Sequence, residues 1–248
     1  MNQRFTLKIG DSLRTSGKKR FYNERVFSEI APRYDFITRA LSFWHDAAWK
    51  RVLISWLPPL DAPVCADLAC GTGDIAFLLA GKYPRGRVSG LDITEPMLAL
   101  ARRRNAHDNV RFIHGDMAGL PLTSGTADIV TGGYALRNAP DLATTIGEIH
   151  RVLKPGGVAA FLDFSKPSDP LLQRLEYWLL KGWTGLWGIL LHGNHEVYSY
   201  IAESLDAFPD RAKLHGMLRE KGFEVLQTRL NFFGITEILM VRKEIRHD

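Results

Sequence analysis

The sequence is poor in cysteine and has no long apolar run. Only two of its 248 residues are cysteines, Cys65 and Cys70, and both lie in one short segment. This excludes a disulfide framework and a cysteine zinc cluster, and it fits a reducing compartment. No stretch approaches about 18 uninterrupted apolar residues, so we expect no membrane-spanning helix. No group of Asp, Glu and His residues has metal-ligand spacing, so we expect no metal site.

Excess positive charge is confined to one end of the chain. The formal net charge is +5, and residues 1–25 hold seven basic and two acidic residues, so the remainder is neutral. We therefore divide the chain into a basic N-terminal arm, residues 1–24, and a single domain, residues 25–248. The arm is either a solvated terminus or a contact with anionic lipid headgroups or nucleic acid. No apolar segment follows it, so we do not expect a secretory signal.

Short apolar runs alternate with helical segments over most of the chain. A helical cap is expected at residues 25–60, and Lys154–Gly157 is expected to end a later helix. The alternation predicts an α/β fold with βαβ units and a mostly parallel sheet, closed by an antiparallel pair at the C-terminal edge. The seven expected strands are 64–69, 87–92, 110–113, 127–130, 158–164, 223–230 and 235–242, and the helices among them are 74–80, 96–104, 142–153 and 211–221.

Residues 168–209 interrupt this alternation with an aromatic and aliphatic segment. Arg174, Glu176 and Lys181 break the apolar run, so it does not span a bilayer. The segment is either a pair of apolar helices packed beside the sheet, or a lid that lines an apolar tunnel for a lipid tail and touches a membrane surface.

A glycine turn follows the first expected strand. Gly71, Thr72 and Gly73 precede a helix N-terminus, where free N–H groups face a ligand that can approach the backbone closely. Asp92 ends the second strand, where a carboxylate typically accepts the hydroxyls of a ribose, and Asp116 follows the third strand. Together these residues predict a nucleoside-binding crevice at the carboxyl ends of the strands.

Acidic residues around the turn argue against a dinucleotide. The turn lacks the third glycine of a dinucleotide turn, and Asp74 at the helix start would repel a diphosphate. S-adenosylmethionine (AdoMet) carries an amino group and a sulfonium, so Asp67 and Asp74 suit its positive end. The alternative is an ordinary strand-to-helix turn in which Asp74 caps the helix.

Several segments match, in order, the motifs of one known family. Those at 67–74, 91–98 and 115–121 are shared widely by class I methyltransferases, whereas more specific ones lie at 31–35, 135–138, 151–157, 163–167, 198–204 and 208–209. On these motifs the chain resembles the UbiE-type C-methyltransferases of ubiquinone and menaquinone biosynthesis, from about Arg25 to about Lys243. The resemblance implies a Rossmann-like class I fold and AdoMet as the methyl donor.

The resemblance also implies roles for single residues. It places a substrate site at Tyr34, Arg137 and Asn138. Gly133 stands where the family has a serine that touches the cofactor, so that side-chain contact is missing here. The cofactor-binding residues expected from the turn and the resemblance together are Asp67, Gly71, Thr72, Gly73, Asp92, Asp116, Met117 and Gly133.

Methyl transfer to a ring carbon needs an ionised phenol beside an aligned donor. Arg137 would stabilise the phenolate or orient a water, since arginine stays charged in proteins. Asn138 would hold the quinol oxygen, and Tyr34 would hydrogen-bond it from the cap. The alternatives are a salt bridge for Arg137, a turn role for Asn138 and ordinary packing for Tyr34.

The chain departs from the family where the substrate ring would be capped. The family pattern Ser-Phe-Gly-x-His becomes Ser42–Asp46, so the histidine moves to position 45 and Trp44 replaces a glycine. A one-residue move on a helix turns a side chain by about 100°. Ile37 and Thr38 stand where the family has Met-Asn. Three histidines are expected to have no catalytic role, His45, His192 and His195.

We expect an AdoMet-dependent methyltransferase that acts on a ring carbon of a demethylated prenyl-quinol. The alternatives are another phenolic or polyketide acceptor, a non-catalytic AdoMet-binding subunit of a quinone-pathway assembly, and an RNA methyltransferase. The last is disfavoured because the charge lies in one arm, so we expect no nucleic-acid partner. The expected protein is cytoplasmic, with a lipid or small-molecule quinol substrate and a peripheral contact at the inner face of the membrane. A homodimer is an open alternative.

Overall fold

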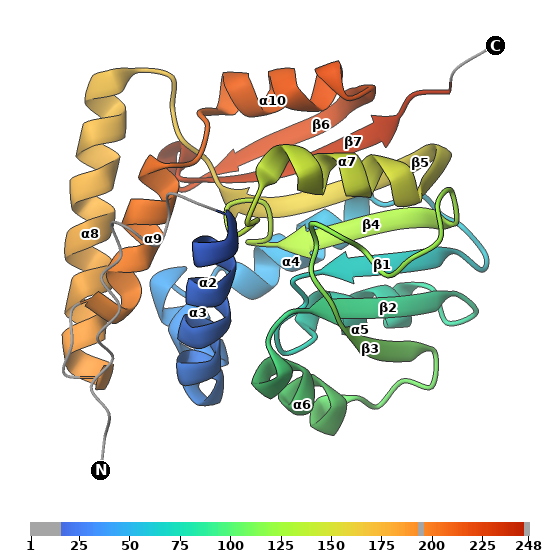
Figure 1. The fold of residues 1–248 in the computed structure, drawn as a ribbon, viewed down its shortest axis with the longest axis horizontal. Helices are drawn as coiled ribbons and strands as arrows, with labels where there is room; N and C mark the ends of the chain where they lie inside the picture. The colour runs from blue at the N-terminus through green and yellow to red at the C-terminus, as the bar shows by residue number, and fades with distance from the viewer. Residues whose placement is uncertain (1–15, 193–195, 246–248) are drawn as a thin grey trace.

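A seven-stranded sheet lies at the centre of the computed structural model, which describes residues 16–192 and 196–245 (Figure 1). The strand order is β3-β2-β1-β4-β5-β7-β6; β1 to β5 pair in parallel, and β7 is antiparallel to both its neighbours. The predicted fold class is therefore confirmed. The strands are β1 (Val64–Leu68), β2 (Arg87–Asp92), β3 (Val110–His114), β4 (Ala127–Gly133), β5 (Leu153–Phe164), β6 (Phe223–Asn231) and β7 (Thr236–Lys243).

Apolar side chains fill two cores, one on each face of the sheet. Neighbouring residues of β1 alternate between them, so that Ala66 belongs to one core and Cys65 to the other. Helices α7 and α10 cover the first face, and α4 and α5 cover the second (Figure 1). The helices around the sheet are α4 (Asp46–Trp56), α5 (Asp74–Lys82), α6 (Glu95–Arg104), α7 (Leu142–Val152) and α10 (Arg211–Glu220), and a short 3-10 helix, η2 (Phe232–Gly234), joins β6 to β7.

Strand β5 begins earlier than the sequence predicts. Lys154–Gly157, expected to end a helix, lies within the strand because Leu153 already pairs with Ala127 at the start of β4. A register shift beside Ala127 accommodates the extra residues. Gly156 takes a φ of +76°, a left-handed conformation that glycine adopts without strain.

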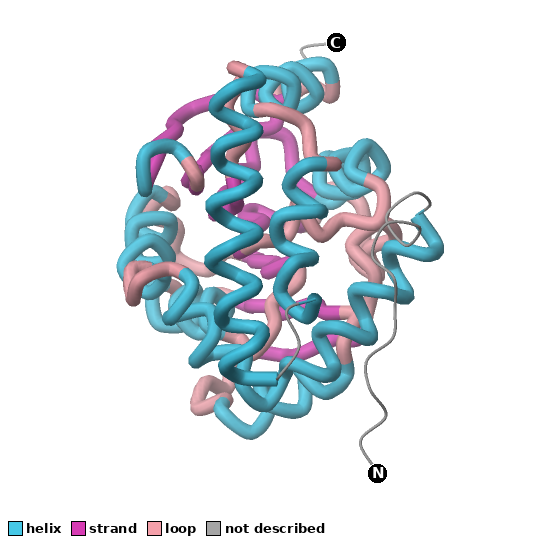
Figure 2. Tube along the Cα trace, turned by 90° about the vertical axis from the view of Figure 1, so that its left-hand side faces the viewer, coloured by secondary structure: helices cyan, strands magenta, loops and turns pink. Residues whose placement is uncertain are grey.

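A further group of helices stands at the carboxyl ends of the parallel strands (Figures 1 and 2). Tyr22, Val26, Ile37 and Tyr200 pack together there with Met97 of α6. This small core joins the start of the chain to its second half and covers the strand ends. The elements are α2 (Ser16–Ile30), η1 (Ala31–Arg33), α3 (Tyr34–Leu41), α8 (Pro170–His192) and α9 (Glu196–Asp206).

The boundary expected after residue 24 does not coincide with the end of an element. Helix α2 runs without a break from Ser16 to Ile30, because Tyr22 packs against the Tyr200 ring and Asn23 donates a hydrogen bond to the Asn138 carbonyl. Outside the described part lie residues 1–15 of the arm, His195, and the side chains of His192, Tyr198 and Ser199.

Helix α8 carries a buried carboxyl group. Glu176 is 7% exposed, and its Oε1 has no hydrogen-bond partner among the described residues. Burial raises the pKa of Glu176 to about 7, and Arg211 and Lys166 only partly oppose this effect. None of the described helices, α8 included, combines the length and apolarity that crossing a membrane requires.

Replacing Glu176 by Gln should therefore change the pH dependence of stability. Between the unfolded pKa, about 4.3, and the folded value near 7, the folded state holds a proton that the unfolded state lacks. Stability accordingly falls as pH rises through this window. Thermal unfolding should show that E176Q gains in Tm over the wild type from pH 5 to pH 8. The exposed variant E29Q should show no such trend, and a difference that is constant with pH would contradict the assignment.

Candidate functional site

Two cavities lie side by side at the carboxyl ends of the parallel strands. The smaller, of about 50 Å³, lies between α2 and the glycine turn that follows β1. The larger, of about 520 Å³, lies among α2, α3, α8 and α9. Phe27, Tyr34, Tyr134 and Asn138 line both cavities and form a common wall between them. A group bound in one cavity therefore lies next to a group bound in the other.

The glycine turn forms the floor of the smaller cavity. Gly73 has a φ of +94°, and a Cβ atom there would lie 2.7 Å from the Phe77 ring, so only glycine fits. Asp92 accepts hydrogen bonds of 2.8 Å from the backbone N–H groups of Gly71 and Thr94, one on each carboxylate oxygen. Each oxygen keeps a lone pair for a ligand hydroxyl.

Most of the predicted cofactor residues lie together at the smaller cavity, but not all of them do. Thr72 donates its hydroxyl to Asp35 Oδ1 at 2.6 Å instead of facing the cavity, so its contact with the cofactor stays a prediction. Asp67 and Gly73 lie behind the lining. The predicted residues that line this cavity are Gly71, Asp92, Asp116, Met117 and Gly133.

Asp67 is buried on β1 with an unsatisfied oxygen. Its Oδ1 accepts the Thr131 hydroxyl at 2.8 Å, whereas Oδ2 has no hydrogen-bond partner among the described residues. Burial raises the pKa of Asp67 to about 7. Leaving such an oxygen unpaired costs about 1–3 kcal/mol, so a cationic group or a water beside it would be stabilising.

Helix α2 closes the smaller cavity, which the sequence did not reveal. Arg20 reaches Asp116 Oδ2 at 3.3 Å, and Asn23 also lines the cavity. Both residues fall in the segment that the charge pattern assigned to an arm. No motif marks them, because the contact joins segments that are far apart in the sequence.

The lining of the smaller cavity fits AdoMet better than a dinucleotide. Asp92 and Asp116 offer acceptors for hydroxyl and amino groups, and Met97 and Met117 offer apolar surface to a planar base. The unpaired oxygen of Asp67 suits a positive group. A diphosphate would instead meet carboxylates.

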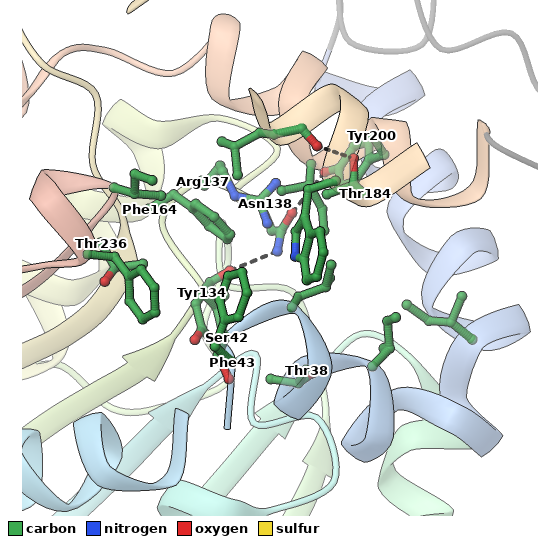
Figure 3. Close-up of a pocket in the computed structure, with 18 of the residues that line it drawn as sticks. Thr38, Ser42, Phe43, Tyr134, Arg137, Asn138, Phe164, Thr184, Tyr200 and Thr236 are labelled. Atoms are coloured by element: carbon green, nitrogen blue, oxygen red, sulfur yellow. Dashed lines mark hydrogen bonds between the residues drawn. The ribbon is translucent and has the colours of Figure 1, made fainter. Parts of the chain in front are cut away.

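The larger cavity is mostly apolar. Aliphatic and aromatic side chains from α2, α3 and α8 make up most of its lining. Figure 3 shows Arg137, Asn138 and Tyr200 gathered at one side of it, with Tyr134 beside them. The guanidinium and the amide in its lining thus lie together at one end, next to the smaller cavity.

Arg137 presents its charge to this polar end. The residue is 3% exposed, and its guanidinium lies 5.0 Å from the centre of the Phe164 ring and 5.8 Å from that of Tyr200. It donates a hydrogen bond to the Ser204 hydroxyl, and its Nε lies 3.9 Å from an Asp163 oxygen. At 3.9 Å the two charges attract each other without a hydrogen bond, so this ion pair is weaker than a hydrogen-bonded salt bridge, the alternative role considered for Arg137.

Asn138 is held by both ends of its amide group. Its Nδ2 donates to the Tyr134 carbonyl at 2.7 Å, and its Oδ1 accepts the Tyr200 hydroxyl at 2.9 Å. One N–H of the amide remains for a ligand. Tyr34, also in the common wall, lies against the glycine turn, with its ring 3.5 Å from the position of a Cβ on Gly71, and burial raises the pKa of Tyr34 to about 12.

Asp74 is not the helix cap considered from the sequence. Gly73 occupies the N-cap position of α5, and Asp74 instead accepts hydrogen bonds from Lys50 at 3.0 Å and Arg104 at 2.8 Å. Arg104 also bonds Asp35 of α3 at 3.0 Å. These contacts join the helical cap to the glycine turn. The described residues contain no cluster of His, Cys, Asp and Glu that could hold a metal ion.

In the altered segment 42–46, Asp46 points inward, whereas Trp44 and His45 do not. Trp44 is 65% exposed, and neither Trp44 nor His45 lines a cavity. His45 packs against Trp49 and lies 2.7 Å from the Phe43 carbonyl. Asp46 turns inward and accepts the Tyr134 hydroxyl at 2.9 Å, a pair that the sequence analysis missed.

Comparisons with known proteins agree with this geometry. The model of the ubiE/COQ5 methyltransferase family matches residues 15–243. The chain is 35% identical to a 2-phytyl-1,4-naphtoquinone methyltransferase of Thermosynechococcus vestitus, over 89% of this chain and 98% of that protein. It is 37% identical to a demethylmenaquinone methyltransferase of Thermus thermophilus, over 86% and 97%. A SAM-dependent methyltransferase structure from Thermotoga maritima shares the fold, with a TM-score of 0.63 and 19% identity over 89% and 99%.

Replacing Asp92 by Asn should weaken AdoMet binding. Asn keeps one of the two hydrogen bonds that hold the turn and removes the charge that strengthens hydrogen bonds to ribose hydroxyls, so we expect Kd to rise about 10- to 100-fold. Isothermal titration with AdoMet measures this directly, and circular dichroism checks the fold. The exposed variant D108N should bind as the wild type does. Equal affinity of D92N and wild type would contradict the ribose role.

Proposed function

The chain belongs to the ubiE/COQ5 methyltransferase family, and we propose that it methylates a ring carbon of a demethylated prenyl-quinol. It is an AdoMet-dependent methyltransferase. The observation that carries the choice of acceptor is the larger cavity: about 520 Å³, apolar along most of its lining, with its guanidinium and amide beside the wall shared with the cofactor cavity. A prenyl tail fills apolar space, whereas a quinol ring needs polar groups at one end.

The cofactor cavity presents its ligand to the acceptor through the common wall. Asp92 and Asp116 would hold the nucleoside, and the Asp67 carboxyl, from behind the lining, would favour its positive end. When bound, AdoMet supplies an activated methyl group on a sulfonium. The chain itself therefore has mainly to align the acceptor and to make its ring carbon nucleophilic.

Ionisation of the quinol hydroxyl makes the adjacent ring carbon nucleophilic. Arg137 supports it, because a guanidinium buried among Phe164 and Tyr200 favours a nearby phenolate. The free N–H of Asn138 positions the same oxygen, and Tyr34 contacts the ring from the cap. The apolar walls keep water away, which strengthens these interactions.

The altered cap residues do not narrow the acceptor cavity. Trp44, which replaces the family glycine, lies on the surface, and His45 lies outside both linings. The sequence departure therefore gives no support to a different phenol or a polyketide as acceptor. The substrate-side residues Arg137, Asn138 and Tyr34 all line the larger cavity, which disfavours a non-catalytic subunit.

Transfer of a labelled methyl group tests this proposal. In single turnover with methyl-labelled AdoMet and a panel of reduced quinols and soluble phenols, mass spectrometry should place the label on a quinol ring carbon. Arg137→Gln should slow this step by about 10²- to 10³-fold through loss of phenolate stabilisation. The exposed variant Arg85→Gln should react as the wild type. Label on oxygen, or only on soluble phenols, would overturn the proposal.

We further propose a cytoplasmic enzyme that binds the inner face of a membrane peripherally through α8. Leu171, Leu175 and Trp178 are 78%, 56% and 59% exposed and follow one another along one helix face. Leu179 and Leu186 are also exposed and line the larger cavity, so the cavity mouth opens on this face. A lipid surface is favoured as occupant because it would deliver a tailed quinol directly into the mouth.

The polar residues of α8 and the thiols support this placement. Glu176 is buried and Arg174 is exposed, so the outward charge that interrupts the face is basic and suits anionic headgroups. Both cysteines are free and buried, as expected in a reducing compartment.

Flotation with vesicles of phosphatidylethanolamine and phosphatidylglycerol tests the membrane contact. The wild type should float, and the double variant Leu175→Glu/Trp178→Glu should not, since charge on the face opposes insertion. Leu60→Glu/Leu226→Glu, which places the same charges on exposed leucines elsewhere, should float. A wild type that does not float would contradict the membrane contact. A dimer that the α8 variant breaks would show instead that a second copy covers the face.

A further inference from the structure

No carboxylate or imidazole lines the larger cavity within the described residues. Its polar side chains are hydroxyls, one guanidinium and one amide. Because the quinol hydroxyl must lose a proton before its ring attacks, a base has to reach it through one of these groups. Arg137 cannot accept that proton, since it stays charged.

Among the residues that line the larger cavity, Tyr134 has a hydroxyl that is hydrogen-bonded to a carboxylate. Its Oη donates to Asp46 Oδ1 at 2.9 Å. The Tyr200 hydroxyl is instead hydrogen-bonded to the side-chain amides of Asn23 and Asn138, which do not take up protons. The cavity therefore reaches a carboxylate through Tyr134.

The backbone around Tyr134 is arranged to place this side chain. Tyr134 has a φ of +57°, an uncommon conformation for a residue other than glycine that is kept where the structure requires it. It directly follows β4 and lies in the common wall between the two cavities. Its hydroxyl, once it donates to Asp46, keeps a lone pair for a second hydroxyl.

Asp46 is the buried carboxylate at the end of this contact. Its side chain is 5% exposed and pairs with Lys50 at 2.7 Å. The groups that face this pair are Lys50 from its own helix, Tyr34 from α3, Asp74 from α5 and Tyr134, which directly follows β4. Burial lowers the pKa of Lys50, but Asp46 and Asp74 outweigh burial and raise it above its usual range.

We propose that Tyr134 and Asp46 form the proton relay that ionises the methyl acceptor. The quinol O–H bond breaks and its proton passes to Tyr134 Oη, while the Tyr134 proton passes to the Asp46 carboxylate. The electron pair left on the quinol oxygen is delocalised to the adjacent ring carbon, which forms the new C–C bond as the carbon–sulfur bond of the donor breaks with its pair on sulfur. The ring carbon then loses its hydrogen to water, and Asp46 returns a proton to the oxygen through Tyr134. One proton is released overall.

This relay rests on the proposed quinol methylation, but it can fail separately. If the wild type methylates no quinol, the proposed function is wrong. If the wild type methylates a quinol and Tyr134→Phe does so equally well, only the relay is wrong. Asp46→Asn removes the base and keeps the shape, and Asp46→Glu should restore part of the rate.

The decisive readout is the dependence on acceptor acidity. With an ordinary quinol, Tyr134→Phe and Asp46→Asn should slow single turnover by about 10²- to 10⁴-fold. With a nitro-substituted naphthol that is already ionised at the assay pH, both variants should react at nearly the wild-type rate. Equal loss with both acceptors would mean that the pair only positions the substrate and would overturn the relay. Tyr83→Phe, another buried tyrosine that bonds the Pro58 carbonyl away from the cavities, is the matched control.

Discussion

The ion pairs on Asp74 hold the helical cap against the glycine turn, and both cavities depend on that contact. Lys50 of α4 and Arg104 of α6 reach the carboxylate at 3.0 and 2.8 Å. Arg104 also pairs with Asp35, which accepts the Thr72 hydroxyl from the turn itself. Lys50 is 9% exposed and pairs with both Asp46 and Asp74, so removing Lys50 would leave the buried Asp46 carboxylate without its ion-pair partner, at a cost of about 3–5 kcal/mol. The cap and the turn therefore form one unit.

This unit separates two chemical environments with a thin wall. One side has carboxylates that suit a nucleoside with a positive end, and the other is a largely apolar chamber. Tyr34, Tyr134 and Asn138 line both sides, so a donor and an acceptor bound in the two cavities would meet without a charged group between them. Alignment of this kind supplies much of the rate when the donor is already activated. The exposed face of α8 extends the apolar environment to the surface, where a lipid-borne acceptor would enter.

Local sequence patterns predicted the sheet and the cofactor side of the site, and contacts between distant segments explain what they missed. Short apolar runs that alternate with helices mark the strands, and Gly71, Asp92 and Asp116 lie at or just after strand ends, so topology alone brings them together. The Tyr134–Asp46 bond joins residues 88 apart, and nothing in the spacing of either residue indicates the other. Arg20 likewise meets Asp116 only because α2 folds back over the strand ends. The Lys154–Gly157 run was read as a stop signal because pairing with β4 cannot be seen locally.

The central claim is that the donor and a tailed acceptor meet across the wall of Tyr34, Tyr134 and Asn138. The most direct test is a crystal structure with S-adenosylhomocysteine and a demethylated prenyl-quinone bound together. The account predicts the nucleoside beside Asp92 and Asp116, the quinone ring against Tyr134 and Asn138, and the tail running toward α8. A quinone ring bound along the outer face of α8, or a nucleoside in the larger cavity, would contradict it.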